Sequence, residues 1–172
     1  GSEMCIRDSL TPGCTVSFGG SMTLEDTGML TALRHDPGIT LLDRAQAKTP
    51  EETKKIYHDA LSSDFYFMST NAITKDGELV NIDGTGNRVA ALIYGPEHVI
   101  VMAGMNKVAA NVDEALSRVH GTATPMNCKR LGKNTPCSAT GVCSDCLSPD
   151  CICNQVVITR RSGIEGRIKV IL

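Results

Sequence analysis

The feature that most restricts the fold of this chain is a regular alternation of short apolar runs with helical segments. β-Branched and aromatic residues gather in runs that suit buried strands, at residues 14–18, 39–42, 65–70, 79–82 and 98–103. The segments between them carry helix-start residues and helical apolar spacing, at residues 23–35, 50–62, 87–94 and 107–120. This order predicts an α/β domain in three layers, with helices on both faces of a mostly parallel sheet. Two further strands are expected at residues 155–159 and 168–172.

The composition limits the classes of partner. The 172 residues are 41% hydrophobic and 21% charged, which is typical of a globular domain with a buried core. Lys and Arg number 17 and Asp and Glu 19, so the formal charge is −2, and aromatic residues are only 3%. This composition lacks the basic surface and the stacking side chains that favour nucleic acid binding. The apolar runs are far shorter than the roughly 18 residues of a membrane helix, so we expect no membrane partner.

The first ten residues show neither helical nor strand periodicity, and they lack the apolar core of a secretory signal. We therefore interpret residues 1–10 as a non-native scar and assign the domain to residues 11–172. The missing secretory signal favours a cytoplasmic location, where cysteines are kept reduced.

Eight cysteines are the unusual feature of the composition, and six of them lie between residues 128 and 153. Five occupy an aperiodic stretch, residues 131–153, with the spacing C-x5-C-x2-C-x4-C-x-C: Cys137, Cys143, Cys146, Cys151 and Cys153. Clustered cysteines in a reduced compartment indicate metal or redox chemistry more than structural disulfides. We interpret Cys128, nine residues before this group, as a spare.

The stretch contains no histidine, so an all-sulfur site is expected. Thiolates suit an iron–sulfur cluster or zinc. The second C-x-x-C of a zinc ribbon is missing, which favours the cluster, while free or redox-active thiols are a third interpretation.

A glycine-rich turn opens the predicted helix at residues 87–94. Its candidate ligand-binding residues are Gly84, Thr85, Gly86, Asn87 and Arg88. Glycines let the backbone approach a ligand, a helix N-terminus favours an anion, and an arginine can hold phosphate or carboxylate with two hydrogen bonds. The sequence thus predicts a small anionic ligand here, with an ordinary turn and helix cap as the alternative.

Two other strand ends carry candidate ligand-binding residues. Gly19, Gly20 and Ser21 precede a predicted helix, but Glu25 and Asp26 follow at once and would oppose an anion. An uncharged ligand group or tight packing therefore fits this loop better. Asn71 follows the predicted middle strand, at the sheet edge where parallel α/β proteins bind ligands. Its amide can orient a substrate but cannot act as a general acid or base, and a simple turn is the alternative.

Two strings make the chain recognisable. Residues 16–25 (VSFGGSMTLE) and 69–90 (STNAITKDGELVNIDGTGNRVA) resemble the LUD, or lactate-utilisation, domain family, and the cysteine stretch resembles that of a subgroup. The resemblance implies the ribose-5-phosphate isomerase/CoA-transferase-like fold. It also implies a role in oxidation of lactate, a 2-hydroxy acid, to pyruvate with iron–sulfur or redox partner proteins. Members of the family usually extend further at the N-terminus, so we expect an N-terminally truncated domain.

The resemblance also implies roles for particular residues. In the subgroup the position of Cys151 is often basic, which leaves Cys137, Cys143, Cys146 and Cys153 as the expected ligands of a [4Fe–4S] cluster and Cys151 as a substitute. Sugar-phosphate enzymes of the superfamily carry an acid after the middle strand, where this chain has Asn71 and Ala72. The missing carboxylate argues against isomerase chemistry and favours binding or electron transfer.

The alternative function is an enzyme or binding protein for a phosphorylated or CoA-linked small molecule, with a structural zinc at the cysteine stretch. The sequence does not decide whether the protein is an enzyme.

Overall fold

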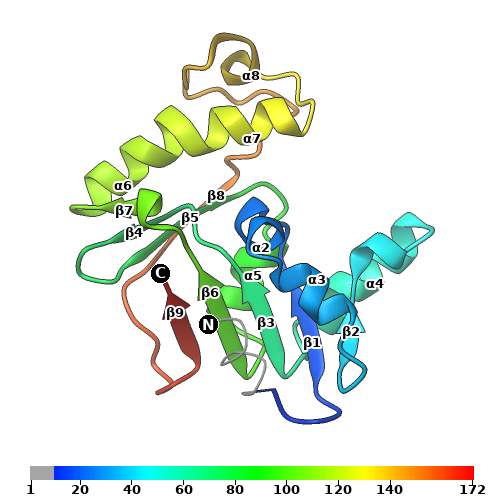
Figure 1. The fold of residues 1–172 in the computed structure, drawn as a ribbon. Helices are drawn as coiled ribbons and strands as arrows, with labels where there is room; N and C mark the ends of the chain where they lie inside the picture. The colour runs from blue at the N-terminus through cyan, green and yellow to red at the C-terminus, as the bar shows by residue number, and fades with distance from the viewer. Residues whose placement is uncertain (1–9) are drawn as a thin grey trace. The chain divides into compact units, whose positions relative to one another are not determined.

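The computed structural model describes residues 10–172, and the chain divides into two compact units (Figure 1). The first unit contains residues 10–69, 90–103 and 162–172, and the second contains residues 70–89 and 104–161. Nine of the ten residues interpreted as a scar lie outside the described part of the chain. The exception, Leu10, packs at the edge of the apolar core of the first unit.

The first unit is built on a parallel sheet with the strand order β2-β1-β3-β6-β9. Its strands are β1 (Thr15–Phe18), β2 (Thr40–Leu42), β3 (Phe65–Met68), β6 (His98–Met102) and β9 (Ile168–Ile171). All four residues of the central strand β3 are buried, as expected for a strand covered on both faces. The α/β class with a mostly parallel central sheet is thereby confirmed.

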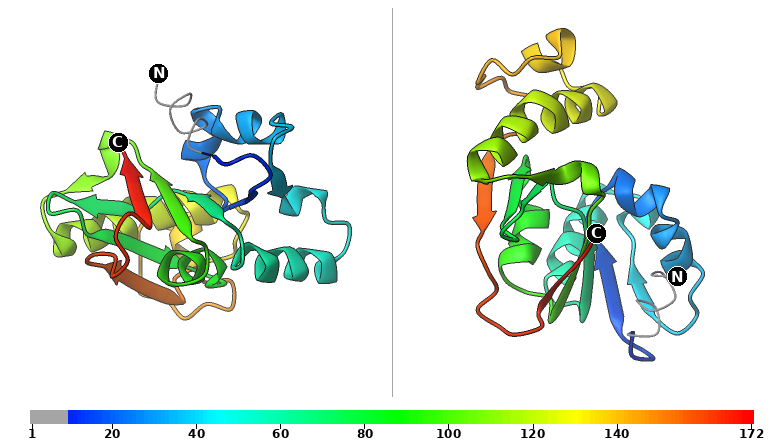
Figure 2. Two further views of the ribbon diagram at one scale, coloured as in Figure 1. Left: turned by 90° about the horizontal axis from the view of Figure 1, so that it is seen from below. Right: turned by 60° about the vertical axis from the view of Figure 1, so that its left-hand side comes forward.

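Helices cover both faces of this sheet, with α2 (Met22–Asp26) and α3 (Met29–Arg34) on one side and α4 (Pro50–Ala60) and α5 (Asn87–Ile93) on the other (Figure 2). A 3₁₀ turn, η1 (Arg44–Gln46), precedes α4. The start of α4 follows the sequence prediction: Thr49 Oγ1 accepts a hydrogen bond from the Glu52 backbone N–H at 3.1 Å, and Pro50 occupies the first turn.

The helix predicted at residues 23–35 is in fact two helices. Gly28 lies between α2 and α3 in the left-handed conformation, with φ of 74°. A residue in that conformation ends a helix, and glycine adopts it at little cost. The N-cap of α2 is Ser21, because Ser21 Oγ accepts a hydrogen bond from the Leu24 backbone N–H at 3.4 Å.

The buried side chain of Arg167 connects the lead into β9 with the end of α5. Its guanidinium donates to the carbonyl oxygens of Leu92 (2.7 Å), Ala91 (2.9 Å) and Pro96 (3.0 Å). The last carbonyls of a helix have no partner within the helix, so this arginine satisfies groups that are otherwise buried without one.

The second unit has its own sheet, which the sequence analysis did not predict. The strand order is β7-β4-β5-β8, with β4 (Ala72–Thr74), β5 (Leu79–Asp83), β7 (Val108–Ala109) and β8 (Gln155–Thr159). β5 runs antiparallel to both β4 and β8, and β4 is parallel to β7. The strands β4 and β7 are two or three residues long, too short to show periodicity.

The helix predicted at residues 107–120 begins later and extends further than expected. Residues Met105–Lys107 form a 3₁₀ turn (η2) and the next two residues form β7, so α6 starts only at Val112 (α6, Val112–Arg118). The helix then continues through a π-helical segment, η3 (Val119–Ala123), into α7 (Thr124–Arg130). A single further turn, α8 (Pro136–Thr140), lies within the cysteine stretch.

The apolar face of α6 and η3 packs on the second sheet. The buried residues of this core are Ala72, Val80, Ile82, Ala109, Ala115 and Val119. Within residues 10–172, no helix combines the length and the apolar character that crossing a membrane requires.

Replacing Arg167 with Met should destabilise the protein, because three buried carbonyl oxygens lose their donor. We expect the free energy of unfolding to fall by at least about 2 kcal/mol in urea titrations. Arg161→Met removes an exposed arginine nearby in the chain and is the matched control. Equal unfolding midpoints for the two variants would show that the Arg167 contacts contribute nothing.

Candidate functional site

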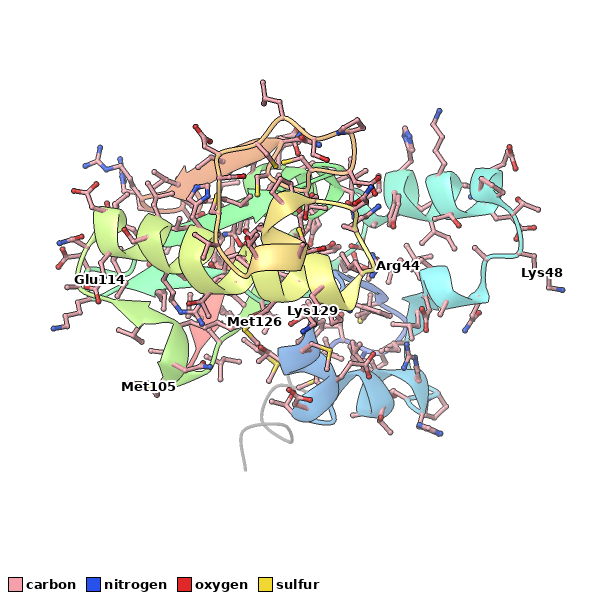
Figure 3. The ribbon with its side chains drawn as sticks, turned by 90° about the horizontal axis from the view of Figure 1, so that it is seen from above. Arg44, Lys48, Met105, Glu114, Met126 and Lys129 are labelled. Carbon is pink, nitrogen blue, oxygen red and sulfur yellow. The ribbon has the colours of Figure 1, made fainter. Side chains whose placement is uncertain are left out.

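One face of the continuous helix formed by η3 and α7 carries polar and sulfur-containing side chains. His120, Thr124 and Cys128 follow one another at intervals of four residues, which places helical side chains on the same face. Thr124 and Cys128 are buried, whereas Met126 and Lys129, both labelled in Figure 3, are exposed. The buried side of α7 therefore faces the interior of the second unit.

Each of these three residues contacts a different thiol of the cysteine stretch. Cys143 Sγ lies 3.4 Å from His120 Nδ1, and the Cys153 thiol donates to Thr124 Oγ1 at 3.8 Å. The Cys128 thiol is a neighbour of the Cys137 thiol. Three of the four predicted ligands are thus distributed along one helix face. Cys128, which we interpreted as a spare, is part of this contact.

Burial keeps the sulfurs of Cys153 and Cys128 in the thiol form. It raises the pKa of Cys153 to about 12, and the neighbouring Cys151 adds to the effect. Burial likewise raises the pKa of Cys128, with smaller contributions from Cys137 and Cys151. Buried anions without a nearby positive charge are unfavourable, so these groups become thiolates only when a cation offsets their burial.

The seven described cysteines are free thiols. In residues 10–172, no three His, Cys, Asp or Glu side chains are arranged closely enough to hold a metal ion. The ligand set Cys137, Cys143, Cys146 and Cys153, with Cys151 as its substitute, therefore stays a prediction. His120 was missed because its distance in sequence from Cys143 is 23 residues, and only its four-residue spacing from Thr124 and Cys128 pointed to it.

Two predicted ligand-binding residues, Asn71 and Arg88, are in direct contact. Arg88 Nη2 donates to Asn71 Oδ1 at 2.9 Å and to the Ile82 carbonyl at 3.0 Å. Its Nη1 donates to Asn81 Oδ1 at 2.5 Å, and its Nε lies 3.2 Å from Asp83 Oδ2. The guanidinium is thus held by residues of β5 and by Asn71, the residue before β4.

The predicted anion-binding turn is closed by its own carboxylate. Asp83 Oδ1 accepts from the backbone N–H groups of Thr85 (3.1 Å) and Gly86 (2.7 Å). Gly84 has a packing role, since a Cβ at this position would lie 3.2 Å from the Ile152 Cα. Asn87, the next predicted residue, is the first residue of α5. The structure therefore supports the turn-and-cap alternative for the backbone of this segment.

Two further basic residues of the second unit are Arg118 and Lys107. Arg118 Nη1 donates to the Asn71 carbonyl at 2.7 Å, and its Nε donates to the Asn106 carbonyl at 2.9 Å. Lys107 follows Asn106 directly. Burial, together with repulsion by Arg118 and Arg88, lowers the pKa of Lys107 to about 8. Neither residue is marked by a local sequence pattern, because the two come from separate elements, η2 and α6.

The remaining predicted residues belong to the first unit and have structural roles there. The Gly19 N–H donates to the Phe67 carbonyl at 2.8 Å, which ties the end of β1 to β3. The Arg44 guanidinium occupies the space that a Cβ of Gly20 would need. Ser21 caps α2. Tight packing, one of the two interpretations given for this loop, is thus observed.

The model of the LUD domain family matches residues 3–172. The chain belongs to the LUD domain family. The resemblance found in its two strings is thereby confirmed. The comparison with curated proteins found no match.

Solved structures are similar to the chain over about two thirds of its length. It is 20% identical to the delta subunit of eIF2B from Chaetomium thermophilum, covering 67% of this chain and 52% of that one, with a TM-score of 0.37. It is 13% identical to ribose 5-phosphate isomerase from Plasmodium falciparum, covering 64% of this chain and 51% of that one, with a TM-score of 0.38. It is also 13% identical to a DUF162 family protein from Deinococcus radiodurans, covering 62% of this chain and 70% of that one, with a TM-score of 0.33. The LUD chain thus spans about half the length of the first two.

The buried position of Lys107 predicts a pH dependence of stability. Its pKa is about 8 in the folded protein against 10.5 for an ordinary lysine. Between these values the unfolded chain binds more protons than the folded chain, so the free energy of unfolding rises with pH through this window. Relative to Lys107→Met, the wild type should gain stability from about pH 8 to 10.5.

Denaturant titrations of both proteins below, within and above this window measure the difference. Lys129→Met, which removes an exposed lysine of α7, is the control. A wild-type-minus-variant difference that stays constant across the window would contradict the lowered pKa.

Proposed function

We propose that this LUD-domain protein binds a [4Fe–4S] cluster through Cys137, Cys143, Cys146 and Cys153, with Cys151 as a substitute ligand. It serves as an electron-transfer component of the oxidation of lactate, or another 2-hydroxy acid, to the 2-oxo acid. Its partners are iron–sulfur or redox proteins of the cytoplasm. The observation that carries the proposal is the contact of three of these thiols with one helix face, through His120, Thr124 and Cys128.

The chemistry of the donors fits such a cluster. Four thiols are soft ligands, and the stretch that carries them contains no competing histidine. Burial holds Cys153 as a thiol when no cation is near. A bound metal cation would favour the thiolate form of this side chain. Cluster binding requires residues 141–153 to bring Cys143 and Cys146 to the same centre as Cys137 and Cys153.

A bound cluster supplies single-electron transfer, and the helix face supplies its surroundings. Hydrogen bonds to ligating sulfurs change a cluster's reduction potential. His120 and Thr124 contact two of the predicted ligands, Cys143 and Cys153. We assign both as positioning residues that orient the thiolates.

Structural zinc is the second candidate, and one observation favours it. His120 Nδ1 is 3.4 Å from Cys143 Sγ, which adds a nitrogen donor of the kind found in Cys₃His zinc sites. In that case the family fold would serve a phosphorylated or CoA-linked ligand, and the cysteine stretch would only hold α8 and β8 in place.

Metal analysis separates the candidates. Protein purified without oxygen should be brown and should contain iron and acid-labile sulfide in equal amounts. Cys146→Ser should lose the colour, because one ligand is removed. Cys14→Ala, a buried cysteine of the first unit, should keep it and is the control. Colourless protein with one zinc per chain would overturn the cluster assignment.

His120→Ala adds a second discrimination. A cluster held by four thiolates should survive this change with an altered reduction potential, since only a hydrogen bond to a sulfur is lost. A zinc ion held partly by the imidazole should instead be lost from the variant. Zinc content and the potential of the anaerobic protein measure the two outcomes.

A further inference from the structure

We propose that the outer edge of β8 is a self-association surface, where β8 of a second copy of this chain pairs antiparallel and joins two sheets into one. β8 is the last strand of the second sheet, and β5 is its one neighbour among the described residues. In the right-hand view of Figure 2 it is the orange strand at the outside of that sheet. The outer side of an edge strand presents backbone N–H and C=O groups that a further strand can pair with.

β8 differs from the other strands that stand at the edges of the two described sheets. β7 and β2 are only two and three residues long, and β9 carries the exposed Lys169. Short length and an exposed lysine are devices by which edge strands avoid pairing with other chains. Residues 155–159 contain no charged residue, glycine or proline, and their register with β5 runs through all five residues without a bulge. The edge of β8 is therefore open to pairing.

The side chains of β8 leave apolar surface at this edge. Val156 and Ile158 lie directly opposite Ile82 and Val80 of β5, so all four belong to the sheet face that packs against α6 and η3. The two residues of β5 are buried, whereas Val156 is 52% exposed and Ile158 is 41% exposed. The apolar face of the sheet thus continues to an edge where it is only partly covered. A further strand with apolar residues at the same positions buries this surface.

The sequence of β8 is complementary to itself, which is the reason to assign a second copy as the partner. An antiparallel pair centred on Val157 places this residue opposite Val157 of the second copy and places Val156 opposite its Ile158. Gln155 and Thr159, both polar, lie opposite each other in the same register. A twofold axis perpendicular to the sheet relates the two strands, so the apolar face of one copy continues in the other.

The arginines that follow β8 favour this register over others. In the centred pair, Arg160 and Arg161 lie opposite Asn154 and Cys153 of the second copy, neither of which is a cation. Moving the centre to Thr159 places Arg160 opposite the apolar Ile158, and moving it one residue further places the two Arg160 side chains opposite each other. Like charges directly opposite destabilise a strand pair. The centred register therefore combines apolar pairs with separated charges.

Sedimentation of the full-length protein in reducing buffer, which removes intermolecular disulfides, tests the proposal. We expect a monomer–dimer equilibrium with a dissociation constant on the order of 100 µM, because one pair of short strands buries less area than a standard interface. Val156→Lys and Ile158→Lys should each raise this constant at least about tenfold, since a lysine then lies opposite an apolar residue. Met126→Lys, which changes an exposed apolar side chain of α7, should leave it unchanged and is the control.

Hydrogen exchange of the wild type locates the contact without relying on any variant. The backbone amides of β8 that point away from β5 should exchange more slowly as the protein concentration rises. The outward amides of β9, at the edge of the first sheet, should exchange at a constant rate.

Three results would overturn the inference. They are a wild type that stays monomeric up to about 1 mM, equal association of the wild type and both β8 variants, or association that leaves exchange in β8 unchanged. None of these measurements depends on iron, so their failure is distinguishable from failure of the proposed cluster.

Discussion

The guanidinium of Arg88 is the interaction on which the second unit depends. A charged side chain that is only 13% exposed is tolerated only with several partners, and here they come from β5 and from Asn71, the residue before β4. The bonds to Asn71 and Asn81 connect the two strands, and the ion pair with Asp83 holds the turn. The first turn of α5 is thereby fixed to the sheet of the second unit.

The second constraint is the four-residue spacing of His120, Thr124 and Cys128. Because a helix is stiff, the contacts of these side chains hold Cys143, Cys153 and Cys137 along one line. The π-helical segment Val119–Ala123 contains the first of the three, and such segments occur often at functional sites. The aperiodic cysteine stretch therefore has ordered contacts although it has little secondary structure of its own.

Local signals account for what the sequence predicted correctly. The apolar strands of the parallel sheet and the Thr49-Pro50 helix start depend on neighbouring residues, and all appear close to the expected positions. The short strands β4 and β7 do not, because pairing within the second sheet creates them. The same holds for the candidate site: the contact of Asn71 with Arg88 joins residues 17 apart, and that of Cys143 with His120 joins residues 23 apart. Neither contact can be predicted from helical or strand periodicity in the sequence.

The glycine-rich turn at 83–86 shows why a motif alone does not define an anion site. Its glycines and its place before a helix suit a phosphate, yet Asp83 makes three contacts there: Oδ1 accepts from two backbone N–H groups and Oδ2 pairs with Arg88. The carboxylate thus takes the position that an anionic ligand would need. An internal carboxylate within such a turn therefore satisfies the backbone donors and the arginine that an anionic ligand would otherwise use.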